Sequence, residues 1–167
     1  EDPPTKRQAS LPLCVFNALR DNDATILDKA IGELTNGALY FAMRSCEYST
    51  TSEKNPRTKR LRVRNIQFYN SRGHRIKKKK KFHRAHCITI TFENQKNGEK
   101  METITRTQGR KNSQFKPVKI WADIVTRILS YEDTGPDTFV NVVCVDGKLR
   151  EITASMIGLK IKACVDK

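Results

Sequence analysis

The sequence predicts an α+β domain that is mainly helical and contains a small antiparallel sheet of about three strands. Apolar residues recur at helical spacing before residue 45. They alternate with polar residues between about residues 60 and 107, and the helical spacing returns from residue 117. The 167 residues suit one domain, which we place at residues 13–167, behind a flexible proline-containing linker at 1–12.

The first half of the chain is expected to be helical. Asp23 is suited to cap a helix whose apolar positions are Ile26, Leu27, Ala30, Ile31 and Leu34. The stretch "ALYFAM" at 38–43 is apolar all round, so we expect it to lie in a buried helix. Asn36-Gly37 is either a break or a tight joint between helices.

Strands are expected next. In "KRLRVRNIQFYN" at 59–70, Leu61 and Val63 alternate with arginines, which predicts a half-buried strand with a cationic face. In "HCITITFENQKNGEKMETITRT" at 86–107, isoleucines alternate with threonines on both sides of Asn97-Gly98, a hairpin signal. Met101 and Ile104 are expected to lie in the return strand of this hairpin.

Helices are expected to dominate the second half. "KPVKIWADIVTRILSY" at 116–131 places apolar side chains on one side of a helix: Val118, Trp121, Ile124, Val125 and Ile128. A short hairpin turning at Asp146-Gly147 follows. A last helix, capped by Thr153, is expected to run to the end of the chain.

Positive charge is concentrated in one stretch. The formal net charge is +14, and residues 54–84 contain fourteen Lys and Arg with no Asp or Glu; the rest of the chain is balanced. Such a stretch attracts polyanions, above all nucleic acid. Alternatively, the lysine run is a solvated loop or a nuclear-import signal. The DNA-binding candidates are Arg60, Arg62, Arg64, Arg72, Arg75, Lys77, Lys78, Lys79, Lys80, Lys81 and Arg84.

Cysteine usage argues against a metal or disulfide scaffold. The five cysteines are widely spaced with no C-x-x-C pair, so we expect reduced thiols, no metal site and no cofactor. The sequence shows no signal peptide and no apolar stretch of about 20 residues. These features predict a nuclear or cytoplasmic protein that is neither secreted nor membrane-bound.

Arg44 stands behind a run without charge in "GALYFAMRSCEYST" (37–50), and Glu47 follows three residues later. Taken alone, Arg44 is a cation favourable to a helix end, or one half of an i, i+3 pair with Glu47. The order of this R-x-x-E, a basic strand and then a lysine-bearing hairpin resembles the catalytic domain of tyrosine recombinases. These are phage-integrase-type DNA breaking-and-rejoining enzymes. Within that family, the sequence most resembles the eukaryotic Crypton-type mobile-element recombinases.

The resemblance implies roles for particular residues. Arg44 would bind the non-bridging oxygens of a phosphodiester, and Glu47 would hold the region around Arg44 in place. Lys96, or alternatively Lys100, would be the hairpin lysine that protonates the leaving oxygen as general acid. Double-stranded DNA is the implied partner, with further copies of the chain assembled on it, and the segment at about 70–84 would be a basic insertion.

The sequence departs from this family at its second catalytic box. It contains no H-x-x-R, and Tyr131, the one tyrosine after the hairpin, is not in the expected place for the nucleophile. We therefore expect a truncated or decayed copy that does not carry out DNA recombination or integration alone. The alternative is a non-enzymatic basic nucleic-acid-binding module, such as a domesticated recombinase remnant.

Overall fold

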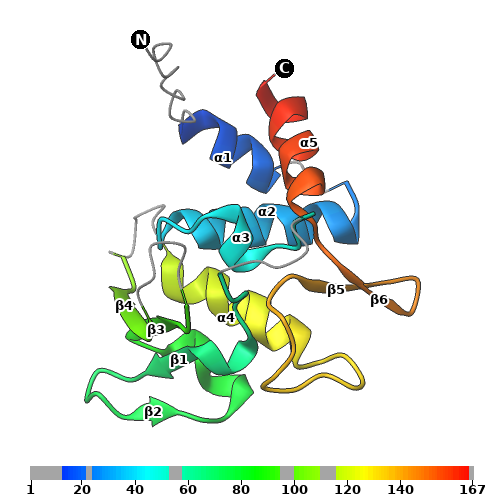
Figure 1. Ribbon diagram of the computed structural model, residues 1–167. Helices are drawn as coiled ribbons and strands as arrows, with labels where there is room; N and C mark the ends of the chain where they lie inside the picture. The colour runs from blue at the N-terminus through cyan, green and yellow to red at the C-terminus, as the bar shows by residue number, and fades with distance from the viewer. Residues whose placement is uncertain (1–12, 22–23, 53–57, 95–99, 110–115, 166–167) are drawn as a thin grey trace.

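The computed structural model describes residues 13–21, 24–52, 58–94, 100–109 and 116–165. It has a mixed α+β fold, as expected (Figure 1). The helices are α1 (Leu13–Asp21), α2 (Ile26–Leu39), α3 (Ser45–Tyr48), α4 (Pro117–Ile128) and α5 (Ala154–Val165), with 3-10 turns η1 (Val63–Asn65) and η2 (Lys79–Arg84). The strands are β1 (Ile66–Tyr69), β2 (Arg75–Ile76), β3 (Cys87–Phe92), β4 (Glu102–Thr107), β5 (Val142–Val145) and β6 (Lys148–Glu151).

The main sheet is antiparallel, in the order β2-β1-β3-β4. It has four strands rather than about three, because the short β2 adds to the outer side of β1, pairing Phe68 with Ile76. The predicted alternation of β3 is confirmed, with Ile88 and Ile90 fully buried. Ile104 lies in the return strand β4 as predicted, whereas Met101 precedes that strand and is 65% exposed.

The core lies where α4 packs between the sheet and α2, and α1 and α5 lie beyond α2 (Figure 1). All five predicted apolar positions of α4 are buried. The Trp121 indole Nε1 donates to the Gly37 carbonyl at 3.1 Å. A Cβ on Gly37 would lie 3.1 Å from Trp121 Cε2, so glycine allows this close approach of α2 and α4.

Helix α2 differs from its prediction at both ends. Its start is capped by Thr25, whose Oγ1 accepts from Asp28 N at 3.0 Å, while Asp23 lies outside the described residues. The helix continues through Asn36-Gly37 but ends at Leu39, before the "ALYFAM" stretch is complete. Ala42 has a φ of 51°, and Met43 N bonds back to the Ala38 carbonyl at 3.1 Å, which ends the helix.

The predicted basic strand is mostly not a strand. Leu61 and Val63 are buried and the arginines that alternate with them are not, as predicted, but regular pairing begins only at β1. In the residues before β1, the backbone N–H groups donate to different segments of the chain and not to a single neighbouring strand. Leu61 N donates to Glu47 O at 2.8 Å, and Val63 N donates to Thr138 O at 2.9 Å. This segment therefore joins α3 to the loop before β5.

The second hairpin and the start of the last helix follow their predictions, and α5 is described as far as Val165. Strands β5 and β6 pair antiparallel around Asp146-Gly147, which have φ values of 52° and 74°. Thr153 Oγ1 accepts from Met156 N at 3.2 Å at the start of α5. The described ends of the chain, in α1 and α5, lie together, and the β1–β2 hairpin lies at the opposite end of the molecule (Figure 1).

Candidate nucleic-acid interface

A dense cluster of positive charge lies on the segment that links β1 to β3. Residues 72–84 contain eight Lys and Arg and no Asp or Glu, and all eight are exposed. We call them the basic edge, because β2 is the outer strand of the sheet. Its members are Arg72, Arg75, Lys77, Lys78, Lys79, Lys80, Lys81 and Arg84.

The first part of the basic edge is shaped by a tight turn between β1 and β2. The Asn70 side-chain oxygen accepts from the backbone N of both Arg72 and His74, each at 2.9 Å. Gly73 supplies the φ of 76° that the turn requires. Arg75 then pairs with Tyr69 across the ladder, so the backbone of this part of the edge is fixed.

The second part is anchored by one aromatic ring. Phe82 in η2 is 7% exposed and stacks on Phe68 of β1, with ring centroids 4.5 Å apart. Lys79 Nζ donates to the Leu129 carbonyl at 3.1 Å, and His83 Nδ1 lies 3.6 Å from Asp123 Oδ1. The predicted insertion at about 70–84 thus contains a turn, a short strand and a 3-10 segment packed on α4.

The basic edge keeps its charge available. Within the described ranges, none of its eight cations forms an ion pair with a carboxylate. Only Lys79 has a side-chain hydrogen bond to the protein among the bonds found in those ranges. An ordered backbone carrying unpaired cations is suited to a polyanion, because its phosphates meet charge that is not already neutralised.

Arg44 is exposed and stands directly before α3, at its N-cap position. Glu47 is 4% exposed, and its Oε2 accepts from the Arg44 backbone N at 2.9 Å. The alternative of a cation at a helix carboxyl end is therefore wrong, because Arg44 begins a helix. The i, i+3 ion pair is not formed either, since Glu47 bonds the backbone and not the guanidinium.

Of the two predicted lysines the structure describes only Lys100, and the described contacts do not join it to Arg44. Lys96 lies outside the described residues. Lys100 is exposed and precedes β4. Neither Arg44 nor Lys100 lines the surface pocket around Arg60, Arg62 and Arg64. A joint role of the arginine and a lysine on one phosphate stays a prediction.

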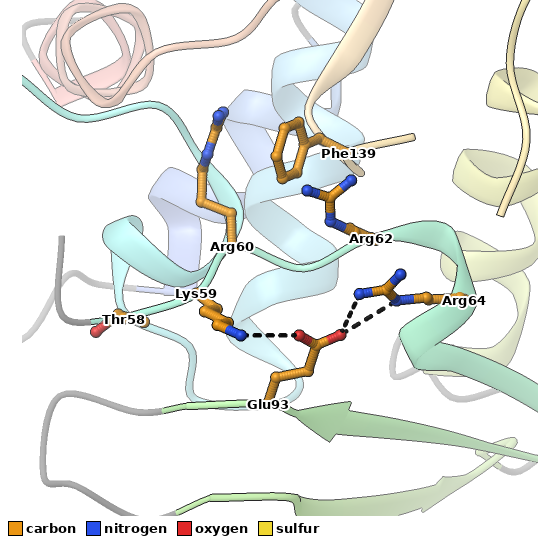
Figure 2. A pocket seen from close by; sticks show the side chains of 7 residues that line it. All are labelled: Thr58, Lys59, Arg60, Arg62, Arg64, Glu93 and Phe139. Atoms are coloured by element: carbon orange, nitrogen blue, oxygen red, sulfur yellow. Dashed lines mark hydrogen bonds and ion pairs between the residues drawn. The ribbon is translucent and has the colours of Figure 1, made fainter. Parts of the chain in front are cut away.

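Arg60, Arg62 and Arg64 gather around a surface pocket of about 340 Å³ (Figure 2). Because Leu61 and Val63 point into the core, the three arginines share the other side of the segment. The remaining lining residues are Thr58, Lys59, Glu93 and Phe139. We call this group of seven the arginine pocket. It is distinct from the basic edge, since the two share no residue.

Two of the three arginines are held by carboxylates. Arg60 Nη1 lies 2.8 Å from Glu151 Oε2. Arg64 Nη2 lies 2.9 Å from Glu93 Oε1, and Arg64 also pairs with Asp137. These pairs tie residues 60–64 to β6, to the end of β3 and to the loop before β5. Arg60 and Arg64 therefore hold the fold together locally, a role that the alternating pattern alone did not indicate.

The pKa values of the two glutamates are set by these contacts. Hydrogen bonds from Asn65 and Arg64 hold the pKa of Glu93 below its ordinary value, against a smaller opposing effect of burial. Burial raises the pKa of Glu151, but hydrogen bonds from Thr50 and Arg60, with the charge of Arg60, outweigh it and lower the pKa overall. Both groups are therefore more firmly ionised than free glutamates.

Several of these residues could not be recognised from the sequence. Phe139 and Asp137 lie in a loop more than 70 residues from the arginines, and Glu151 ends β6. No local pattern marks them, because their role depends on which distant segments the fold brings together. A short antiparallel bridge between Arg62 and Phe139 brings this loop beside the arginines.

The wider features of the chain add little to this picture. Comparisons with protein-family models, with curated proteins and with solved structures gave no match. Among the described residues, there is no cluster of three or more His, Cys, Asp or Glu that could hold a metal ion. None of the described helices has the length and apolar character needed to cross a membrane.

Proposed function

We propose that this protein binds double-stranded DNA through the basic edge. The observation that carries the proposal is the ordered, carboxylate-free array of eight cations between residues 72 and 84, anchored by Phe82. Phosphate contacts supply most of the affinity of non-specific DNA binding, and they require cations more than any particular base contact. A fixed backbone also reduces the entropy lost when the side chains meet DNA.

Arg44 adds a second point of contact and links the proposal to the tyrosine recombinases. Its guanidinium is exposed and has no carboxylate partner in the described residues, while buried Glu47 fixes the backbone from which it projects. An exposed guanidinium on a fixed backbone is suited to a phosphodiester. In the proposed function Arg44 contacts a phosphate, and strand cleavage is not assigned to this chain because H-x-x-R is missing from its sequence.

The test measures the affinity for a fluorescent DNA duplex by anisotropy over a series of salt concentrations. The variant replaces four lysines of the basic edge by glutamine but keeps Lys79, which bonds the Leu129 carbonyl. The slope of log Kd against log salt is expected to fall by up to about 3.6, because each phosphate contact contributes about 0.9. The replaced residues are Lys77, Lys78, Lys80 and Lys81.

A matched control removes the same charge elsewhere. Four exposed cations outside the basic edge are replaced by glutamine: Lys29, Lys148, Arg150 and Lys162. The control is expected to keep most of the salt slope of the unaltered protein. If both variants lost affinity and slope equally, only net charge would matter and the proposed interface would be wrong. Weak binding by the unaltered protein with no salt dependence would also contradict it.

A further inference from the structure

The arginine pocket contains more positive charge than its carboxylates neutralise. Its lining carries four cations, Lys59, Arg60, Arg62 and Arg64, and one carboxylate, Glu93. Glu151 and Asp137 pair with two of the arginines from outside the lining. The pocket lining and its ion-pair partners thus contain four positive and three negative groups. One cation is therefore left without a matching carboxylate.

Arg62 is the arginine without a carboxylate partner in the described structure. Its Nη1 donates to the Asp137 backbone carbonyl at 2.5 Å, which leaves the formal charge unpaired. Lys59 is the next most available cation, because its Nζ lies 3.9 Å from Glu93 and its side chain is 68% exposed. The unpaired charge of the pocket therefore lies on Arg62, beside Asp137, and Lys59 is the second cation, beside Glu93.

Phe139 fixes the guanidinium of Arg62 in place. The Arg62 Cζ lies 4.3 Å from the ring centroid, and the Arg60 Cζ lies 3.9 Å from the same centroid. Figure 2 shows the Phe139 ring beside both guanidinium groups. An aromatic ring attracts the flat face of a guanidinium and leaves the N–H groups at its edge free to donate. The arrangement is thus already ordered before any ligand arrives.

We infer that the arginine pocket is a binding site for a phosphate group, with Arg62 as its principal donor and Lys59 as its second cation. A guanidinium edge donates two parallel N–H bonds to phosphate oxygens, a geometry that lysine cannot reproduce. The volume of about 340 Å³ exceeds what one phosphate needs and leaves room for the group that carries it. Arg60 and Arg64 act as positioning residues through Phe139, Glu93 and Glu151.

The site goes beyond the proposed DNA interface, since none of its residues belongs to the basic edge. The phosphate has two chemical sources: the backbone of a bound nucleic acid, or a free phosphorylated small molecule. Both present the same tetrahedral anion to Arg62. The site should consequently bind inorganic phosphate by itself, and this is the probe that we use.

The test is a titration of the protein with inorganic phosphate at constant ionic strength, with chloride as the replacement anion. Binding is followed by the NMR signal of the Arg62 side-chain Nε–H group. A saturable shift of that signal is expected. The Arg62→Gln variant should bind phosphate about tenfold more weakly or worse, because it loses a charge-assisted pair of hydrogen bonds. Glutamine removes the charge and keeps an amide N–H donor.

The control is Arg150→Gln, which removes an exposed arginine outside both the pocket lining and the basic edge and should leave the phosphate affinity unchanged. Because the Arg62→Gln variant lacks the Arg62 side-chain signal, its affinity for phosphate is measured by calorimetry. If the unaltered protein showed no saturable shift, or if both variants lost affinity equally, the inference would be overturned. The readout on the unaltered protein keeps the test valid even if a variant folds poorly.

The two sources of phosphate are separated by the DNA affinity of Arg62→Gln. A weaker affinity with a salt slope reduced by about 0.9 assigns the pocket to the nucleic-acid backbone. An unchanged DNA affinity, together with lost phosphate binding, assigns it to a free phosphorylated ligand. The four-lysine variant of the basic edge should keep the saturable phosphate-induced shift of the Arg62 Nε–H signal, so the failure of either proposal can be recognised separately.

Discussion

Phe82 connects the basic edge to the core, so its removal tests whether the order of the edge matters in addition to its charge. The ring is 7% exposed and stacks on Phe68 at 4.5 Å between centroids and 20° between planes. Replacing it by alanine should lower the free energy of unfolding by about 3 kcal/mol. Buried Phe→Ala changes cost about 3–5 kcal/mol, and the lower end applies at the rim of the core.

The Phe82→Leu variant separates the stacking from the burial. Leucine keeps most of the apolar volume and loses the aromatic pair, which is worth about 0.5–1.5 kcal/mol. We expect the leucine variant to lose about 1 kcal/mol and to keep its DNA affinity. The alanine variant should bind DNA more weakly although every cation of the edge is still present, because the segment is no longer held on α4.

The assays are urea unfolding, in which the midpoint should move at constant slope, and duplex anisotropy at a salt concentration where both variants are folded. A loss of stability under about 1 kcal/mol for Phe82→Ala would show that the stacked pair does not anchor the segment. An alanine variant that loses stability but binds DNA like the unaltered protein would show that the order of the edge contributes nothing to binding.

Three further changes probe contacts that hold the fold together. Glu47→Ala should destabilise the protein by about 1–2 kcal/mol in urea unfolding, and Glu47→Gln should cost less, because the amide oxygen still accepts the backbone N–H of Arg44; equal losses would contradict this role. Gly37→Ala should lower the free energy of unfolding by about 1–2 kcal/mol despite a better helix propensity, since its Cβ would crowd the indole at 3.1 Å; an unchanged or raised thermal midpoint would refute the close packing. Glu93 and Glu151 have lowered pKa values in the folded state, so their stabilisation is present above the ordinary glutamate value of 4.5 and is lost as the pH falls below it. The double Glu→Gln variant should flatten that acid dependence, measured as midpoint against pH, and an unaltered dependence would argue against these pairs.

The elements that the sequence predicted well are those with a strong local pattern. Helix α4 has apolar side chains at every buried position of its period, and Asp146-Gly147 has the two positive φ values that its residue types favour. In both cases the local conformational preference agrees with the environment in the folded protein, so the sequence pattern was sufficient to predict the element.

The elements that were predicted poorly depend on distant partners. The alternation at Leu61 and Val63 located the buried side correctly, but it could not show that their backbone bonds go to Glu47 and Thr138 instead of a neighbouring strand. For the same reason "ALYFAM" was expected to be helical throughout, whereas the chain turns at Ala42 to place Phe41 against the α4 tryptophan.

The candidate site was predicted in part. The exposure of the basic edge follows from its composition, and the structure adds its anchoring by a buried aromatic ring. The three arginines before β1 looked equivalent in the sequence, yet two are held by carboxylates and Arg62 is not. That distinction depends on Glu93, Asp137 and Glu151, which reach the segment only through the tertiary fold.

The most direct test of DNA binding by the basic edge is lysine labelling with and without a DNA duplex, read by mass spectrometry. The lysines at 77, 78, 80 and 81 are expected to be protected by DNA, while the exposed Lys148 and Lys162 should label at the same rate in both samples. Equal labelling of the basic edge with and without DNA, under conditions where the duplex is bound, would contradict the proposed interface.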